Sequence, residues 1–234
     1  QFFNKSSKNR DIRNFLSRLQ WRCHFMQKFD DEPSMEFENI NRAYDSIRLN
    51  HDENLLKKWR DGSTGIPIVD ACMRCLDQTG YLNFRMRAMI VSFAAFNLWQ
   101  DWKYFSHHLA KKFLDYEPGI HYSQIQMQSA VTGINTVRIY NPVKNSMDLD
   151  PKGEFIKKWV TELKYIPPEY VHEPWKMTKI EQEMYDFFIG KDYPYPIIDI
   201  DLSRKKALDE IWKIRKSTKS KINATKILEK HVNK

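Results

Sequence analysis

Apolar residues recur at helical spacing along most of this chain, in runs that are too long for β-strands. The clearest run begins near Asn83 and continues toward Trp102, with apolar side chains on most of its faces. A helix with this character is buried on most sides. The pattern therefore predicts an all-α fold, with this helix central to the core.

Glycine and proline positions indicate where a second helix begins and ends. Residues 61–67 combine two glycines with serine, threonine and proline, which predicts a turn. Pro67 is placed to open a helix over residues 68–78, because the first helical turn leaves its backbone N–H groups unpaired and proline has none. Gly80 is placed to end that helix.

The second half of the chain alternates between irregular and helical stretches. Residues 116–141 have mixed polarity and no sustained period, which predicts a long functional loop with short helical pieces. A helix is predicted over residues 153–163, stopped by the prolines at 167 and 168. The sequence Tyr-Pro-Tyr-Pro at residues 193–196 predicts an extended linker before a basic C-terminal stretch.

Composition indicates a globular chain with one large domain and a charged tail. Hydrophobic residues make up 41% of the 234 positions, enough for a proper core. We expect a helical domain over residues 1–200 and a basic helical tail over residues 201–234. Lysine and arginine number 38 against 30 acids, and a net charge of +8 suits a polyanion such as nucleic acid. The tail either contacts DNA or is a solvated helix face.

Three cysteines and the lack of a long apolar span predict a reducing, intracellular location without membrane insertion. We expect the cytoplasm, or the nucleus or an organelle of a eukaryote. Cys72 and Cys75 have the C-x-x-C spacing of some metal sites, but they lie inside a predicted helix without a second pair. No metal site is therefore predicted.

Tryptophan, glycine, arginine and acidic positions fall in one characteristic order along the chain. The segments that carry it are WRDGSTGIPIVDACMR at 59–74, GYLNFRMR at 80–87, DYE at 115–117, IYNP at 139–142, DPKGEFIKKW at 150–159 and VHEPW at 171–175. In this order they resemble the FAD-binding helical domain of DNA photolyases and cryptochromes. The resemblance extends over residues 15–175 and implies a multi-helix fold. His172 and its neighbours match a family hallmark that we interpret as a structural clasp.

The resemblance implies that FAD sits folded within the helical domain, where the reduced, excited flavin donates an electron to a pyrimidine dimer in DNA. Arg87 and Asp115 match the ion pair beside the isoalloxazine ring. Glu117 stands where the family usually has a second aspartate, near the pyrimidine edge of the flavin. A buried arginine stabilises the anionic reduced ring and must itself be balanced by a carboxylate. The alternative is an ordinary salt bridge between a helix and a loop.

A second set of matches lies on the substrate side. Trp21 and Arg22 resemble the family tryptophan that stacks on the flipped dimer and the arginine close to FAD. Stacking on a flat aromatic replaces the base stacking that is lost on flipping. Arg18 stands where the photolyases carry a glutamate that protonates the dimer, a departure that weakens the case for ordinary dimer repair.

The segment that usually reads Trp-Gln-Trp in the family is also altered. This chain has Ile125 or Gln126 at the position that touches the flavin, and Met127 at the position that lines the substrate pocket. Of the family's electron relay of three tryptophans, only the middle one has a clear match, Trp102. A relay in this chain would have to use other aromatic residues, and the candidates are Trp99, Tyr104, Tyr122 and Tyr140.

The residue that faces the reactive N5 atom of the flavin falls at His121 or Tyr122. A histidine at this place could exchange a proton near neutral pH. The alternative is a loop histidine that is merely exposed.

The family also has an α/β antenna domain and a segment that holds the FAD phosphates, both before the Trp21 helix. Neither is found in this sequence, so we expect a separate chain or a missing N-terminal region to complete the FAD site. Three functions stay open: a photolyase-like flavoprotein acting on ultraviolet-damaged DNA, single- or double-stranded; a photosensory cryptochrome-type flavoprotein without repair; and a module that binds DNA or protein without FAD.

Overall fold

The structure is a computed structural model, and it describes residues 10–231. The last residues of the predicted basic tail, 232–234, and the first nine of the predicted helical domain lie outside the described part. No β-strand occurs among the described residues, which confirms the all-α prediction. The helices are α2 (Arg10–Asp31), α3 (Glu53–Arg60), α4 (Pro67–Thr79), α5 (Phe84–Ser92), α6 (Lys103–Lys112), α7 (Pro118–Gln128), α8 (Pro142–Leu149), α9 (Glu154–Trp159), α10 (Pro168–Val171), α11 (Lys179–Met184), α12 (Ile200–Lys216) and α13 (Thr218–His231), with 3-10 turns η1 (Pro33–Glu36), η2 (Arg42–Tyr44), η4 (Thr161–Leu163) and η5 (Pro174–Lys176) and the π-helix η3 (Phe93–Asn97).

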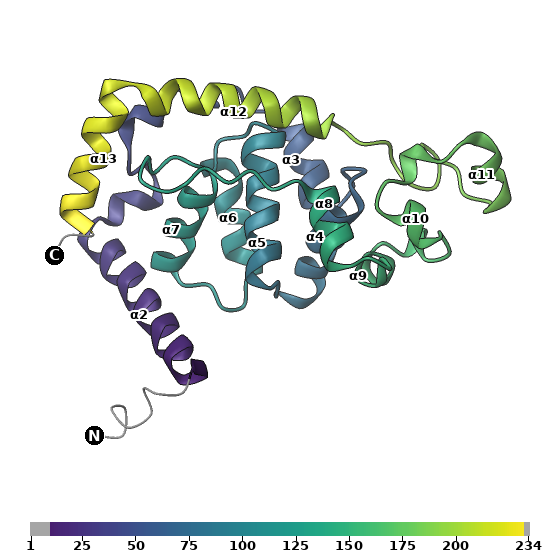
Figure 1. Cartoon of the computed structure of the whole chain (residues 1–234), viewed down its shortest axis with the longest axis horizontal. Helices are drawn as coiled ribbons and strands as arrows, with labels where there is room; N and C mark the ends of the chain where they lie inside the picture. Colours follow the sequence, from purple (N-terminus) through teal and green to yellow (C-terminus); the bar gives the residue numbers. More distant parts are fainter. Residues whose placement is uncertain (1–9, 232–234) are drawn as a thin grey trace.

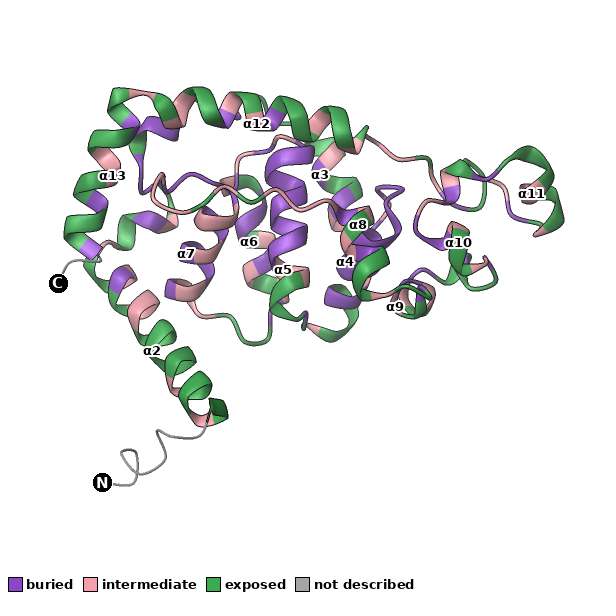
Figure 2. Ribbon diagram, in the orientation of Figure 1, coloured by how far each residue is buried: buried purple, intermediate pink, exposed green. Residues whose placement is uncertain are grey.

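The predicted central helix is present as α5 followed without a break by the π-helix η3. The side chain of Asn83 caps its start by accepting from the backbone N–H of Met86 at 3.1 Å. Every residue from Ala88 to Leu98 is buried, and Figure 2 shows this helix as the buried centre of the molecule. The helix ends before Trp99, whose positive φ of 54° turns the chain away, and therefore stops short of Trp102.

The α4 helix has the predicted ends, since Pro67 is its first residue and Gly80 its left-handed C-terminal residue. The turn before it is fastened by Asp70, whose side chain is fully buried. One carboxylate oxygen accepts from the N–H and the hydroxyl of Thr64 at 2.8 and 2.6 Å. The other accepts from the N–H of Gly65 at 3.0 Å and from the hydroxyl of Tyr193. This carboxylate therefore joins the turn, α4 and the distant residues 193–199.

The prediction of a long loop over residues 116–141 is wrong for its first part, which forms the helix α7. Pro118 opens this helix, and the carboxylate of Glu117 accepts from the backbone N–H groups of Gly119 and Ile120. The helical period was hidden because α7 buries polar as well as apolar side chains. Residues 129–141 then run without helix, as predicted.

Gly119 allows α7 to lie very close to α2. A Cβ atom at this position would be 2.8 Å from the carbonyl oxygen of Phe25 and 2.9 Å from the Cα of Met26. Both of these are backbone atoms of α2, which cannot rotate away. The two helices therefore pack at a distance that only a glycine permits.

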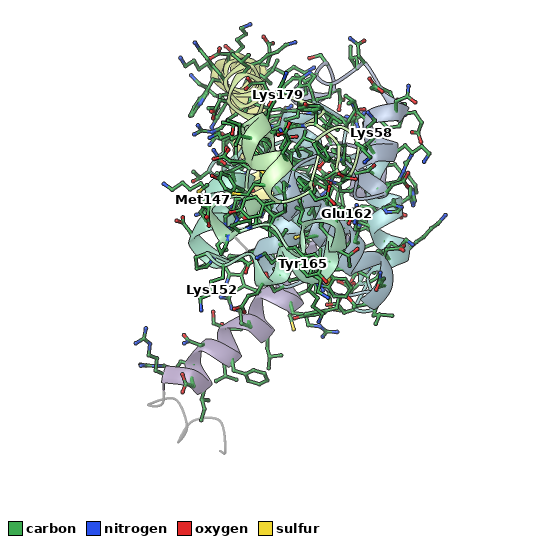
Figure 3. The ribbon with its side chains drawn as sticks, turned by 90° about the vertical axis from the view of Figure 1, so that its right-hand side faces the viewer. Lys58, Met147, Lys152, Glu162, Tyr165 and Lys179 are labelled. Atoms are coloured by element: carbon green, nitrogen blue, oxygen red, sulfur yellow. The ribbon has the colours of Figure 1, made fainter. Side chains whose placement is uncertain are left out.

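The segment predicted as one helix over residues 153–163 is α9 followed by the short turn η4. The clasp expected at His172 is present: its Nδ1 pairs with the hydroxyl of Ser146 at 2.6 Å, and its Nε2 with the carbonyl oxygen of Pro151 at 3.3 Å. Figure 3 views this end of the molecule, with Tyr165 exposed and Glu162 paired to Arg74 of α4 at 2.8 Å.

The last two helices pack against the rest of the fold. Figure 1 shows α12 running along the top of the helical body, where it packs on η3, and α13 turning down toward the C-terminal end of α2. Ala207, Ile211 and Ile227 are buried in this packing. At the far end, Glu32 after α2 accepts from Lys230 and pairs with His231, both at 2.8 Å. Most lysines of α12 and α13 stay exposed.

The N-terminal half of α2 projects from the body of the molecule in both views (Figures 1 and 3). Exposed side chains along α2 include Phe15, Leu19 and Trp21. A membrane-crossing helix, which would have to be longer and more apolar than α2, is not found in the described part of the chain.

Candidate functional site

A pocket with a volume of about 240 Å³ lies where α2, α5 and α7 meet. Its lining is mostly apolar and aromatic, with charged groups contributed by α2, by α5 and by the residues just before α7. The lining residues are Arg18, Trp21, Arg22, Phe25, Phe84, Arg87, Ala88, Val91, Phe113, Asp115, Tyr116, Glu117, Ile120, His121, Gln124, Ile125 and Gln128. Apolar walls with a few convergent polar groups are typical of a cofactor or small-molecule site.

The ion pair predicted between Arg87 and Asp115 is present in the pocket wall. The two guanidinium nitrogens donate to the two carboxylate oxygens at 2.9 and 3.0 Å, the forked geometry that fixes an arginine in direction as well as position. The Nε–H donates to the carbonyl oxygen of Leu82 at 2.6 Å, and the ring of Phe113 lies 4.1 Å below the guanidinium. Arg87 thus presents a fixed positive charge to the pocket.

Glu117 lines the same pocket, and its carboxylate also caps the N-terminus of α7. Both oxygens accept from backbone N–H groups at the start of α7, at 3.1 and 2.8 Å. These hydrogen bonds hold the Glu117 carboxylate at the N-terminus of α7, in the same pocket as the Arg87–Asp115 pair.

Three of the predicted residues, Arg18, Trp21 and Arg22, come from one face of α2 and all line the pocket. Their spacing of three and four residues places them side by side on a helix. The Trp21 side chain is 54% exposed, and its ring centre lies 5.7 Å from that of Phe25 and 5.9 Å from that of His24. Neither arginine has a carboxylate partner among residues 10–231, so both positive charges are free to meet an anion.

His121 is buried in α7 and is not the exposed loop histidine of the alternative reading. Its Nε2 pairs with the carbonyl oxygen of Ser106 at 3.0 Å. Burial lowers the pKa of His121 to about 4, and the charges of His107 and Arg87 add to this, against the opposing effect of the Ser106 carbonyl. The expected proton exchange near neutral pH is therefore wrong, because the ring is neutral there.

We expect the imidazole of His121 to show no titration between about pH 5.5 and 8. The pKa of His121 in the folded chain, about 4, lies below the ordinary value of 6.5, so the unfolded chain binds this proton more tightly than the folded chain does. His121 therefore lowers the free energy of unfolding as the pH falls from about 6.5 to about 4. Imidazole NMR signals followed through a pH titration provide the measurement. A His121 midpoint near 6.5 would contradict the burial argument.

Three predicted site residues lie outside the pocket: Met127, Tyr122 and Trp102. The reason for Met127 is helical geometry, since residues 121, 124, 125 and 128 share the face of α7 that lines the pocket. Met127 lies on another face, so its predicted position on the substrate side is wrong for this structure. The hydroxyl of Tyr122 points toward Glu36, away from the pocket. The ring of Trp102 packs against the ring of Tyr122 and does not line the pocket.

Several lining residues were missed by the sequence reasoning. The aromatic side chains of Phe25, Phe84, Phe113 and Tyr116 complete the walls, and Gln124 and Gln128 add polar groups. Helical spacing would have identified Phe25 and Gln128, because Phe25 lies four residues after Trp21 on the same helix face and Gln128 lies four residues after Gln124.

The structure describes no cluster of three or more His, Cys, Asp or Glu side chains that could hold a metal ion in residues 10–231.

The pocket fits the ring part of FAD. It offers aromatic and aliphatic walls for a planar ring, and a fixed guanidinium beside which negative charge on that ring would be stabilised. Sites that enclose a whole drug-sized ligand measure about 300–1,000 Å³, so this cavity of about 240 Å³ holds only part of a dinucleotide. The described residues thus supply the ring end of such a site.

The helical fold and an arginine–carboxylate pair in an aromatic pocket are the features of a flavin-binding domain. The model of the FAD-binding domain of DNA photolyase matches residues 15–213, and the chain belongs to this family. FAD, the cofactor predicted from the sequence, is the cofactor for which the family is named.

Proteins named as photolyases and proteins named as cryptochromes are both similar to this chain. A deoxyribodipyrimidine photo-lyase of Alkalihalophilus pseudofirmus is 36% identical over 83% of the chain, and cryptochrome-1 of Drosophila melanogaster is 32% identical over 87%. The chain spans 41% and 39% of the length of these two proteins.

Solved structures show the same likeness in three dimensions. A class III photolyase from Agrobacterium tumefaciens has a TM-score of 0.83 and 28% identity, covering 92% of this chain and 46% of that one. An archaeal photolyase from Sulfolobus tokodaii, solved with two FAD molecules, has a TM-score of 0.76 and 30% identity, covering 90% and 46%. The photolyase/cryptochrome helical fold is therefore that of this chain.

Proposed function

We propose that this chain is the helical part of a photolyase-type flavoprotein, which binds the ring of FAD in the pocket and transfers an electron to pyrimidine photoproducts in DNA under light. The observation that carries the proposal is the forked ion pair of Arg87 and Asp115 in an aromatic pocket. Family membership supports the cofactor, and relatives named as photolyases support the reaction.

When bound, the flavin supplies light absorption and one-electron chemistry. The residues of the chain bind and orient it. Arg87 stabilises negative charge on the ring, and Asp115 holds that guanidinium in place. Glu117 lies at the polar edge of the pocket, and the neutral ring of His121 closes one wall without adding a charge.

On the DNA side, the proposed contacts are the exposed ring of Trp21 and the guanidinium groups of Arg18 and Arg22. A base extruded from the duplex stacks on an exposed aromatic ring, and arginines pair with the phosphates beside it. These three residues line the pocket from α2 and are exposed, so a polymer has access to them. Ultraviolet-damaged DNA, single- or double-stranded, is the proposed partner.

The first test is the visible absorption spectrum of the chain after incubation with FAD and gel filtration. Retention of a structured oxidised-flavin band supports the proposed pocket. A second sample adds, as a separate chain, the part of a matched relative that this sequence does not cover, since about three fifths of the length of the matched relatives lies outside this sequence. Loss of flavin from both samples would contradict flavin binding and favour the third hypothesis, a module that binds DNA or protein without FAD.

A photosensory cryptochrome-type role is the second candidate, favoured by the guanidinium of Arg18 where photolyases carry an acid. An arginine cannot protonate a dimer, because a guanidinium keeps its proton far more tightly than a carboxylic acid does. Light-driven repair of a defined dimer oligonucleotide with fully reduced flavin bound separates the two roles. Flavin that is reduced and excited without any loss of dimer would leave the sensory role as the function.

A further inference from the structure

Tyr122 is a buried phenol with a proton acceptor directly in front of it. The ring is 1% exposed, and its hydroxyl donates to a carboxylate oxygen of Glu36 at 3.0 Å. Burial raises the pKa of Tyr122, and hydrogen bonding to Tyr116 and Glu36 raises it further. The phenol is therefore protonated at all ordinary pH values and carries a proton that Glu36 can take.

Tyr122 also lies between the pocket and Trp102. Its ring centre is 5.1 Å from that of His121, which lines the pocket, and 6.3 Å from that of Trp102, which is fully buried. One turn further along α7, Ile125 lines the pocket and carries no aromatic ring. Tyr122 is thus the aromatic group that connects the pocket wall with Trp102.

The two buried rings differ in what happens to their protons. The indole Nε1–H of Trp102 donates to the amide oxygen of Asn39 at 2.7 Å, and a neutral amide is a very poor proton acceptor. The phenol of Tyr122 faces a carboxyl group instead. A tyrosine that loses an electron becomes a strong acid, so a base in hydrogen-bond contact is what allows its oxidation to proceed.

We propose that Tyr122 is a redox-active residue whose oxidation is coupled to proton transfer to Glu36. Tyr122 gives one electron to an oxidant in the pocket, and the phenolic O–H bond breaks as the proton passes to the Glu36 carboxylate. The products are a neutral tyrosyl radical and a Glu36 carboxylic acid, with the oxidant reduced by one electron. The oxidant in the natural setting is the photoexcited oxidised flavin, and in that setting the inference rests on the proposed function.

Other aromatic residues are less suited to this role. The ring of Trp99 lies 4.8 Å from the buried guanidinium of Arg48, a positive charge that opposes removal of an electron. Tyr104 is 49% exposed and stacks on His51 at 3.9 Å, on α6 rather than on a pocket wall. Tyr122 alone combines contact with a pocket residue, contact with Trp102 and a carboxylate partner among the candidates within residues 10–231.

The first experiment needs no flavin. Cys23 is exposed on α2 while Cys72 and Cys75 are buried, so a ruthenium photo-oxidant with a thiol-reactive linker attaches selectively at Cys23. Flash excitation with a soluble electron acceptor then oxidises the protein, and electron paramagnetic resonance of protein with ring-deuterated tyrosine identifies the radical. We expect a neutral tyrosyl radical that forms more slowly in heavy water. A tryptophan radical alone in the unmodified protein would overturn the proposal.

Two substitutions assign the radical and a third controls for general effects. Tyr122→Phe keeps the ring and is expected to abolish the tyrosyl signal. Glu36→Gln keeps a hydrogen-bond acceptor but not a base, and is expected to reduce the radical yield by on the order of tenfold or more. Tyr104→Phe is the matched control and should leave the signal unchanged. An undiminished yield in Glu36→Gln at an unchanged unfolding midpoint would show that the contact is only structural.

The second experiment repeats the measurement with bound FAD as the photo-oxidant, without the ruthenium label. Quenching of flavin fluorescence that is relieved in Tyr122→Phe supports the assignment in the natural setting. If the protein retains FAD and the quenching is the same in both proteins, the inference fails while the proposed function stands. If neither of the two samples of the flavin-retention test retains FAD, the proposed function fails, and the ruthenium experiment still decides the chemistry of Tyr122.

Discussion

Replacing Asp70 by alanine is expected to lower the free energy of unfolding by about 3–5 kcal/mol, the largest effect of any substitution considered for this fold. The change removes one fully buried carboxylate and leaves four donors without a partner: two on Thr64, one on Gly65 and one on Tyr193. Urea unfolding followed by far-ultraviolet circular dichroism gives the measurement. On the same helix, Asp77 pairs with Lys112 at the surface, and Asp77→Ala is the control, with an expected loss below about 1 kcal/mol. Equal losses in the two variants would contradict the role given to Asp70.

The same carboxylate predicts a dependence of stability on pH. Burial raises the pKa of Asp70 from 3.8 to about 6, against the opposing effect of its hydrogen bonds. Protons therefore bind the folded chain more tightly, and the extra stability that comes from protonating Asp70 is fully present below about pH 3.8 and is lost as the pH rises through about 6. Asp70→Asn should remove this component of the pH profile.

Replacing Arg87 by methionine is expected to weaken FAD binding by at least about 100-fold, or roughly 2.7 kcal/mol, so that no flavin survives gel filtration. Methionine keeps the apolar stem that packs on Phe113 but leaves Asp115 as an unpaired negative charge in the pocket wall. Negative charge on the bound ring would then be repelled rather than stabilised. A titration of flavin fluorescence, in the sample that retains flavin when unmodified, gives the dissociation constant.

Arg85 provides the matched control for this experiment. It lies on the same helix, is exposed and does not line the pocket, so Arg85→Met should leave flavin binding unchanged. Because Arg87 also donates to the carbonyl of Leu82, the unfolding midpoint of Arg87→Met is measured alongside. Unchanged flavin affinity in Arg87→Met would remove the observation on which the proposed function depends.

Much of the fold follows from local signals in the sequence. Pro67, Gly80 and Asn83 sit at helix ends because each supplies a backbone or side-chain property that a helix end requires, and the structure has helix ends at these positions. The helix α7 was missed because hydrophobic periodicity reports a boundary between core and solvent. A helix that buries His121, Ser123 and Gln126 has no such boundary.

The candidate site, like the fold, was predicted only in part from the sequence. The charged members, Arg87 and Asp115, were identified because the resemblance supplies spacing between short, distinctive segments. The placement of Met127 failed because a match along the chain does not fix which face of a helix a residue occupies. Likewise, the partner of Tyr122 could not be predicted, since Glu36 is far away in sequence and meets it only through packing of η1 on α7.

The close approach of α2 and α7 at Gly119 has a consequence for the dimensions of the pocket. Both helices line the pocket, and their separation is limited by backbone atoms of Phe25 and Met26 that touch the place where a side chain would be. The width available to a planar ligand is therefore encoded by a residue that does not line the cavity and makes no polar contact with it. A methyl group at position 119 would act as a spacer, moving Trp21, Arg18 and Arg22 together as one rigid wall away from Arg87. The distance between a bound ring and a group stacked on Trp21 is thus set by how closely α2 and α7 pack, and not by the side chains that contact the ligand.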